Sequence, residues 1–266
     1  MSGCTMARMI RAMRSASPAT KKSGETSMAL FQRLFFAVLL AGLISGAAMT
    51  ALQQWRVVPL IVAAEAFEGE EAAPAAHSHD AATPAHSHDA DEWMPADGLE
   101  RTAFTVATGL FAALGFAFVL SAVSVLTGFE VTVRNGVVWG LAGFAVFQLA
   151  PAFGLPPELP GMPAADVVAR QIWWWGTALA TATAIYGMAK FRNAAAVVIG
   201  IVLIVVPHVI GAPQPAEHAS GVPAPLAAAF AANSLAVGLG FWLLLGTAYG
   251  YAVDRLGQRS AKAVTA

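Results

Sequence analysis

Charged residues are scarce in this 266-residue chain: they make up 12% of it, whereas hydrophobic residues make up 57%. A soluble globular domain carries about 25% charged residues, so this composition excludes a disordered chain and an ordinary cytosolic enzyme. The formal net charge is −1, which provides no general attraction to nucleic acid or to acidic lipids. The single cysteine, Cys4, cannot form a disulfide within the chain. These deficits indicate a polytopic membrane protein that does not bind nucleic acid.

Lys, Arg, Asp and Glu are absent from six long apolar stretches of the sequence. They lie near residues 34–52, 103–127, 137–153, 172–188, 194–210 and 225–253. A helix needs about 20 mostly apolar residues to cross the hydrocarbon core of a bilayer. The third to fifth stretches are at the short end of the permitted range, so a re-entrant segment would reduce the number of spans to five. We expect an all-α integral membrane protein with a bundle of about six transmembrane helices.

Basic residues are distributed unevenly between the two sides of this predicted bundle. With a cytoplasmic N-terminus, twelve of the fifteen Lys and Arg residues lie in inner segments, and only Arg56, Arg101 and Arg170 lie in outer ones. Cytoplasmic segments of membrane proteins carry an excess of Lys and Arg. The bias therefore predicts that both termini face the cytoplasm and that the protein spans the inner (plasma) membrane.

Residues 1–27 differ in composition from the rest of the chain. They are basic and rich in Ser and Met, and they contain no apolar run long enough for a signal sequence. Met28 begins the segment that leads directly into the first apolar stretch. We therefore divide the chain into a leader, residues 1–27, which is disordered or a misannotated extension, and a polytopic membrane domain, residues 28–266.

A long polar segment, residues 53–102, interrupts the apolar pattern on the predicted outer side. It carries ten acidic residues and four of the six histidines, and it contains two copies of His-Ser-His-Asp nine residues apart. The repeated side chains are His77, His79 and Asp80 in the first copy and His86, His88 and Asp89 in the second. Neutral imidazole and carboxylate are the donors that suit Co²⁺, Ni²⁺, Cu²⁺ and Zn²⁺. The repeat predicts an outer loop that captures a divalent transition metal; the alternative is a duplicated low-complexity segment without a ligand.

Three further residues on the predicted outer side are candidate metal ligands. His208 lies at the outer end of the fifth stretch, where it could form a fixed site that receives the ion from the loop. Glu65 and Glu68 follow the first stretch, and a short helix there would place both carboxylates on one face. They are either oxygen ligands near the entrance or a solvated helix end.

The apolar stretches contain few side chains that could bind an ion or take part in a reaction. They contain no ionisable residue of the kind that proton- or sodium-coupled transporters carry, and the chain has neither a phosphate-binding G-x-x-x-x-G-K-[ST] loop nor a His-Glu-x-x-His motif. We therefore predict that the protein is not an enzyme and holds no tightly bound cofactor. The polar side chains within the stretches, which include Ser121, Gln148, Thr181 and Ser234, are assigned to hydrogen bonding between helices. Glycines four residues apart, at 42/46, 136/140 and 246/250, predict close helix approach.

Several phrases of the sequence resemble the CbtA family of cobalt transporter subunits. They are VVPLIVAAEAFE at 57–68, the duplicated HSHD loop, WMPADGLER at 93–101, GLPPELPG at 154–161, ARQIWW at 169–174 and PHVIGAPQP at 207–215. The similarity extends from about Met28 to the C-terminus. The resemblance implies Co²⁺ uptake, frequently with a small single-span, His-bearing partner called CbtB. It also implies that His77, His79, His86, His88 and His208 are metal ligands, with Glu65 and Glu68 behind them.

The sequence as a whole predicts a membrane subunit of a Co²⁺ uptake transporter. Its histidine-rich loop would face the periplasm, capture the ion and pass it to the bundle, in support of cobalamin biosynthesis. Two alternatives stay open: a Ni²⁺ or Zn²⁺ transporter subunit with the same mechanism, and a metal-binding sensor or assembly protein that does not transport.

Overall fold

The computed structural model describes residues 17–67, 98–217 and 219–265, and within these ranges every regular element is a helix. The elements are α2 (Ser17–Arg56), α3 (Val58–Glu65), α4 (Leu99–Thr127), α5 (Gly136–Phe144), the π-helix η1 (Ala145–Leu149), α6 (Ala150–Ala152), α7 (Val167–Phe191), α8 (Ala194–Ile210) and α9 (Ala224–Thr265). The predicted all-α class is confirmed. Five of the six apolar stretches lie within single helices, and α5, η1 and α6 together cover the third as far as residue 152.

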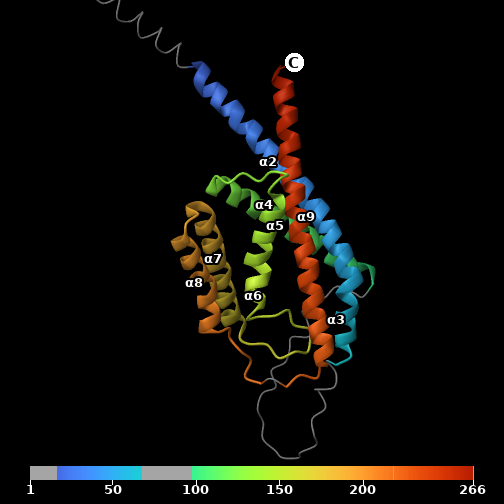
Figure 1. Cartoon of the computed structure of the whole chain (residues 1–266). Helices are drawn as coiled ribbons and strands as arrows, with labels where there is room; N and C mark the ends of the chain where they lie inside the picture. Colours follow the sequence, from blue (N-terminus) through green and yellow to red (C-terminus); the bar gives the residue numbers. More distant parts are fainter. Residues whose placement is uncertain (1–16, 68–97, 218, 266) are drawn as a thin grey trace, which may run out of the picture.

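The helices run back and forth between two ends of the molecule (Figure 1). The terminal end is where α2 enters and α9 leaves the bundle, and the loop end is where α3, the 153–166 loop and the 211–223 loop lie. α2 begins at Ser17, within the segment predicted to be a leader. The short helix predicted to follow the first apolar stretch is present as α3, which ends at Glu65.

The centre of the bundle is formed by α2, α4, α5 and α9, and glycines permit the close contacts there. A Cβ atom on Gly42 or Gly46 of α2 would meet α4, and one on Gly136 or Gly140 of α5 would meet the backbone of α9 at Gly246 and Trp242. Small residues let helix backbones approach in this way. The predicted glycine pairs therefore bring parts of this bundle together: the first two pairs and Gly246 lie against other helices, and Gly250 lies against the backbone of Thr132, before α5.

Aromatic side chains and one polar contact complete this centre. Trp242 and Tyr249 of α9 are almost fully buried beside Phe116 of α4, whose ring lies 5.1 Å from that of Trp242. The hydroxyls of Tyr249 and Ser121 form a hydrogen bond of 2.8 Å that links α9 to α4. Ser121 thus confirms the prediction of hydrogen bonding between helices.

α7 and α8 form a hairpin that packs mainly on itself and contacts the centre through η1 and α6. Asp166 and Asn193 cap the two helices, because their side-chain oxygens accept hydrogen bonds from the backbone N–H groups of Ala169 and Ala196. α7 ends at Phe191 and is closed by Arg192, whose φ of 50° is the left-handed conformation that closes many helices.

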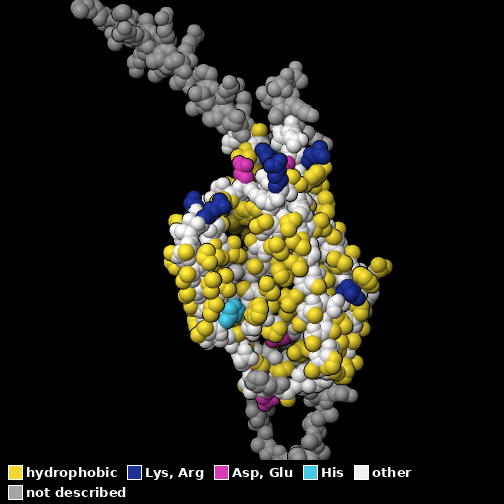
Figure 2. Space-filling view, in the orientation of Figure 1, with side chains coloured by type: hydrophobic (Ala, Val, Ile, Leu, Met, Phe, Trp, Pro, Cys, Tyr) yellow, Lys and Arg dark blue, Asp and Glu magenta, His cyan; other side chains and the backbone are white. Residues whose placement is uncertain are grey.

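Apolar side chains cover most of the visible middle of the molecule, and most Lys and Arg side chains in that view lie toward the terminal end (Figure 2). In the part of the chain that the structure describes, three helices are long and apolar enough to cross a membrane: Ser27–Arg56, Leu99–Thr127 and Ala224–Gln258. Two shorter apolar helices cover Gly136–Ala152 and Ala194–Ile210. α7 has 25 residues but carries Arg170 and Lys190. Six spans and cytoplasmic termini stay predictions.

Candidate metal path at the loop end

Most of the metal ligands predicted from the sequence lie outside the described residues. They are His77, His79, Asp80, His86, His88, Asp89 and Glu68. Glu65 and His208 are described, and both lie at the loop end, at or next to the end of a helix. Among the described ranges, no group of three or more His, Cys, Asp and Glu side chains is placed to hold a metal ion. The predicted ligand set stays a prediction.

Glu65 is the last residue of α3 and forms an ion pair with Arg101 in the first turns of α4. The Arg101 Nη2 and Glu65 Oε1 atoms are 2.7 Å apart, and the two side chains are 46% and 37% exposed. The pair joins the two helices on either side of residues 68–97. One oxygen of the Glu65 carboxylate is therefore engaged by a guanidinium at the base of the predicted metal-capturing segment.

His208 lies in the last turn of α8 and is half-buried between aromatic rings. The Trp173 and Phe153 ring centroids lie 5.7 Å and 6.0 Å from that of His208, both edge to face. The adjacent backbone is held in place, because the Trp173 indole N–H donates a hydrogen bond of 3.1 Å to the Pro207 carbonyl. His208 is thus fixed within an aromatic group on the α7–α8 hairpin, whereas Glu65 lies on α3, which packs against α9.

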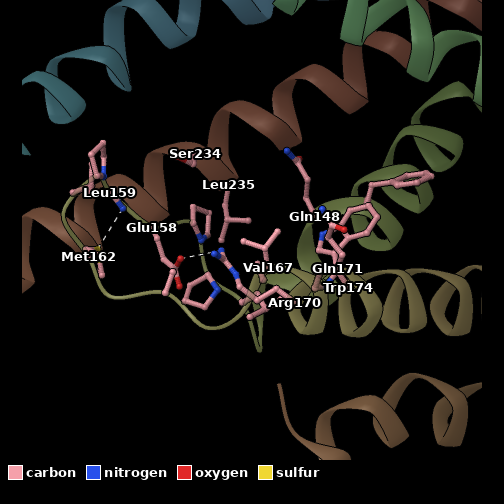
Figure 3. A pocket seen from close by; sticks show the side chains of 18 of the residues that line it. Gln148, Glu158, Leu159, Met162, Val167, Arg170, Gln171, Trp174, Ser234 and Leu235 are labelled. Carbon is pink, nitrogen blue, oxygen red and sulfur yellow. Dashed lines mark hydrogen bonds and ion pairs between the residues drawn. The ribbon is translucent and has the colours of Figure 1, made fainter. Parts of the chain in front are cut away.

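A cavity of about 720 Å³ lies at the loop end between η1, α6, the 153–166 loop, the start of α7 and α9 (Figure 3). Its polar lining is small: Gln148, Glu158, Arg170, Gln171 and Ser234. Apolar and aromatic side chains, among them Trp174 and Leu235, form most of the remaining wall. Pockets of this size and character are typical of small-ligand sites.

The ion pair between Glu158 and Arg170 crosses this cavity's loop side. The Arg170 Nη2 and Glu158 Oε2 atoms are 2.9 Å apart, and the side chains are 30% and 22% exposed. Glu158 is held firmly because its neighbour Leu159 is 3% exposed and packs in one cluster with Ala64 and Val222. Ala64 precedes Glu65, so Glu65 and Glu158 both adjoin the same apolar cluster.

Gln148 forms the opposite side of the cavity, and Arg170 lies between Gln148 and Glu158 in Figure 3. Its Oε1 atom is buried and has no hydrogen-bond partner. The prediction that Gln148 hydrogen-bonds to another helix through this oxygen is wrong, and the same holds for Thr181 Oγ1. Gly238 of α9 leaves the space for the Gln148 amide, since a Cβ atom there would overlap it.

Gln148 belongs to the π-helical turn, whose widening has a local cause. Pro151 has no N–H to continue the α-helical pattern, and its ring would press on the carbonyl four residues earlier. The wider turn appears in the bond from the Ala150 N–H to the Ala145 carbonyl, five residues back. Single π-turns occur frequently at functional sites.

Sequence reasoning missed the cavity, although two signals mark it. The first is the proline-rich GLPPELPG phrase with a single acidic residue, and the second is a lone Gln five residues before the end of an otherwise apolar stretch. Neither signal reveals that the 153–166 loop returns to the same place as η1.

The fold and the site define an all-helical, strongly apolar protein, with three helices long and apolar enough to cross a membrane and a mainly apolar cavity, lined in part by polar side chains, at one end. The chain belongs to the CbtA family: the family model described as "Probable cobalt transporter subunit (CbtA)" matches residues 31–254. This match confirms the resemblance seen in the sequence. Neither a curated protein nor a solved structure matches the chain.

Proposed function

We propose that this chain is the membrane subunit of a Co²⁺ uptake transporter that supports cobalamin biosynthesis. The family match over residues 31–254 carries the proposal for cobalt transport. In this proposal the chain spans the inner membrane with six helices, both termini are cytoplasmic, and the loop end faces the periplasm. The protein has no catalytic role and keeps no tightly bound cofactor; Co²⁺ is its cargo.

The outer loop captures the ion through His77, His79, His86 and His88, with Asp80 and Asp89 as additional oxygen ligands. Glu65, Glu68 and His208 then receive the ion at the surface of the bundle. The position of Glu65 and His208 at the same end of the molecule supports this order. The family description as a subunit supports a partner, for which a small single-span, His-bearing protein of the CbtB kind is the candidate.

Uptake of radiolabelled Co²⁺ tests the capture step directly. In the native host at limiting Co²⁺, replacing the four loop histidines by Ala should lower the initial rate at least about tenfold, because losing even the hydrogen-bond partners of metal ligands typically costs roughly 10- to 100-fold in metal affinity or activity. His218→Ala is the matched control, since His218 lies on the same predicted side but outside the repeat. Unchanged uptake by the four-histidine variant would overturn the capture role of the loop.

The donor set does not by itself select cobalt, because Ni²⁺ binds such ligands more tightly in the Irving–Williams order. Competition experiments with Ni²⁺ and Zn²⁺ therefore belong to the same assay. Stronger inhibition of Co²⁺ uptake by excess unlabelled Co²⁺ than by either competitor is expected. A sensor without transport activity would instead bind Co²⁺ after purification and give no uptake above that of cells lacking the chain.

A further inference from the structure

We infer that the cavity of about 720 Å³ binds the headgroup of a phospholipid that carries an ammonium group, with Glu158 and the Trp174 ring holding the ammonium and Arg170 holding the phosphate. The inference goes beyond the proposed function, because it concerns the lipid around the protein and does not depend on which ion is transported. It relies on the loop end lying at a membrane surface, as the apolar helices of the bundle indicate.

The charges of the cavity lining match a zwitterion rather than an ion of one sign. In the part of the lining that the structure describes, the charged side chains are Glu158 and Arg170, so their charges cancel. The Arg170 Nη2 and Glu158 Oε2 atoms are 2.9 Å apart. A carboxylate has two acceptor oxygens and a guanidinium has five N–H donors, so each group can bind a further partner while the ion pair stays intact. A ligand with one ammonium and one phosphate therefore adds no net charge and displaces neither side chain.

Aromatic rings form part of the cavity wall near this ion pair. Phe147, Trp174 and Trp175 all line the cavity, and the Trp174 ring centroid lies 5.0 Å from that of Trp175 and 6.2 Å from that of Phe147. The faces of aromatic rings, indole above all, attract ammonium groups of ligands. Arg170 and Trp174 are four residues apart at the start of α7 (Figure 3), so one face of this helix provides both a phosphate partner and a ring for the ammonium.

The rim of the cavity continues into the apolar surface of the bundle. Val167 and Trp175 line the cavity, yet each of these side chains is more than half exposed. Leu179, one turn beyond Trp175 on the same face of α7, is also more than half exposed. An apolar strip therefore leads from the cavity toward the middle of the bundle, where the acyl chains of the same lipid would lie. The tryptophans support this depth, because Trp is enriched at the level of the headgroups.

The size of the cavity suits a headgroup. Its volume of about 720 Å³ is within the range of about 300–1,000 Å³ that is typical of pockets for small ligands. A phosphate and an ammonium joined by two carbons fit in this space together with several waters, since each water takes about 30 Å³. A free zwitterion of the same chemistry would also fit, but the exposed apolar rim favours a ligand that carries acyl chains.

Lipid retention by the purified, full-length protein tests the site without measuring transport. The protein in detergent is mixed with equal amounts of phosphatidylethanolamine and phosphatidylglycerol that have identical acyl chains, and the lipids retained after washing are quantified by mass spectrometry. We expect a several-fold excess of phosphatidylethanolamine, because phosphatidylglycerol has the phosphate but no ammonium. Equal retention of the two lipids would indicate a non-selective lipid layer and would overturn the inference.

Glu158→Gln and Arg170→Gln should change lipid retention in different ways. Glu158→Gln leaves the Arg170 charge unbalanced, so the excess of phosphatidylethanolamine should disappear and more phosphatidylglycerol should be retained. Arg170→Gln removes the phosphate partner, so retention of both lipids should fall. Glu130→Gln is the matched control, because it makes the same chemical change as Glu158→Gln in the loop after α4, at the terminal end, and should keep the original ratio. If the ion pair only supports the fold, both cavity variants lower the thermal midpoint and keep the original lipid ratio, which would overturn the inference.

Trp174→Leu tests the aromatic wall. The loss of the ring should lower retention of phosphatidylethanolamine several-fold and change retention of phosphatidylglycerol less. Trp55→Leu is the matched control, because Trp55 of α2 is exposed and lies outside the cavity lining. Equal losses for the two variants would show that Trp174 contacts lipid only as any exposed tryptophan does, and would overturn its role in holding the ammonium.

Glycerophosphoethanolamine, which has the headgroup without acyl chains, identifies the source of the ligand. At the concentration of the phospholipid it should displace little of the retained phosphatidylethanolamine. Displacement as complete as that by the phospholipid itself would show that the cavity takes a soluble zwitterion, and would overturn the assignment to a lipid. None of these measurements involves cobalt, so a failure of Co²⁺ uptake by the intact chain would contradict the proposed function and leave the lipid result unchanged.

Discussion

The two sides of this molecule differ in how well their polar groups are satisfied. On the α2–α4–α9 side, Tyr249 and Ser121 pair with each other in the interior, and glycines bring the backbones into contact. On the η1–α7 side, Gln148 of η1 and Thr177 and Thr181 of α7 each bury an oxygen without a hydrogen-bond partner, and a cavity lies at the loop end of this side. Thr50 of α2 is the exception on the first side, because its Oγ1 atom is also buried without a hydrogen-bond partner. The first side is therefore a closely packed scaffold, whereas the second side is packed less completely and keeps unsatisfied polar atoms.

The largest effect is expected where the scaffold is tightest. Gly140→Ala places a Cβ atom against the backbone of α9 at Trp242, and overpacking of this kind costs about 2 kcal/mol. Gly115→Ala is the matched control, because a Cβ atom there meets nothing within 4 Å. Unfolding in detergent, followed by loss of tryptophan fluorescence, should show a large loss of stability for the first variant only. Similar losses for both would remove the distinction between scaffold and surface.

An intermediate effect should separate the satisfied polar groups from the unsatisfied ones. Ser121→Ala removes the hydrogen bond to Tyr249 and should lower the free energy of unfolding by about 1 kcal/mol. Thr177→Val removes a buried hydroxyl that has no partner, so it should leave stability unchanged or increase it. The same unfolding assay measures both. A greater loss for Thr177→Val than for Ser121→Ala would show that Thr177 belongs to the scaffold.

The smallest effect is expected at the exposed ion pair of the loop end. Glu65→Gln breaks the contact with Arg101, but both side chains are more than one-third exposed. Exposed pairs contribute about 0–1 kcal/mol and are weakened by salt. The expected change in unfolding free energy is near zero at high salt. A loss of stability that persists at high salt would show that the Glu65–Arg101 pair is part of the scaffold.

The helices could be predicted from the sequence because long, charge-free apolar stretches leave few alternatives. The glycine spacing also predicted the close helix contacts, because glycines four residues apart lie on one face of a helix and let another backbone approach that face. The hydrogen bond of Ser121 to another helix was predicted because this polar side chain lies within an apolar stretch. These features depend on residues close together in the chain.

The cavity could not be predicted, because it depends on where separate segments meet. The positions of Glu158 and Gln148 in the sequence give no indication that the loop and the π-turn line one space. Gln148 was expected to hydrogen-bond because most buried amides do, and the sequence does not tell which helix it faces. The duplicated His-Ser-His-Asp segment had the clearest sequence signal, and it falls outside the described residues.

The most direct test of the central claim is the initial rate of Co²⁺ uptake by otherwise identical cells that carry or lack this chain together with its partner. Cobalt transport by the chain predicts a rate that depends on the chain and that excess unlabelled Co²⁺ inhibits more strongly than excess Ni²⁺ or Zn²⁺ does. Equal rates in cells with and without the chain would contradict the account.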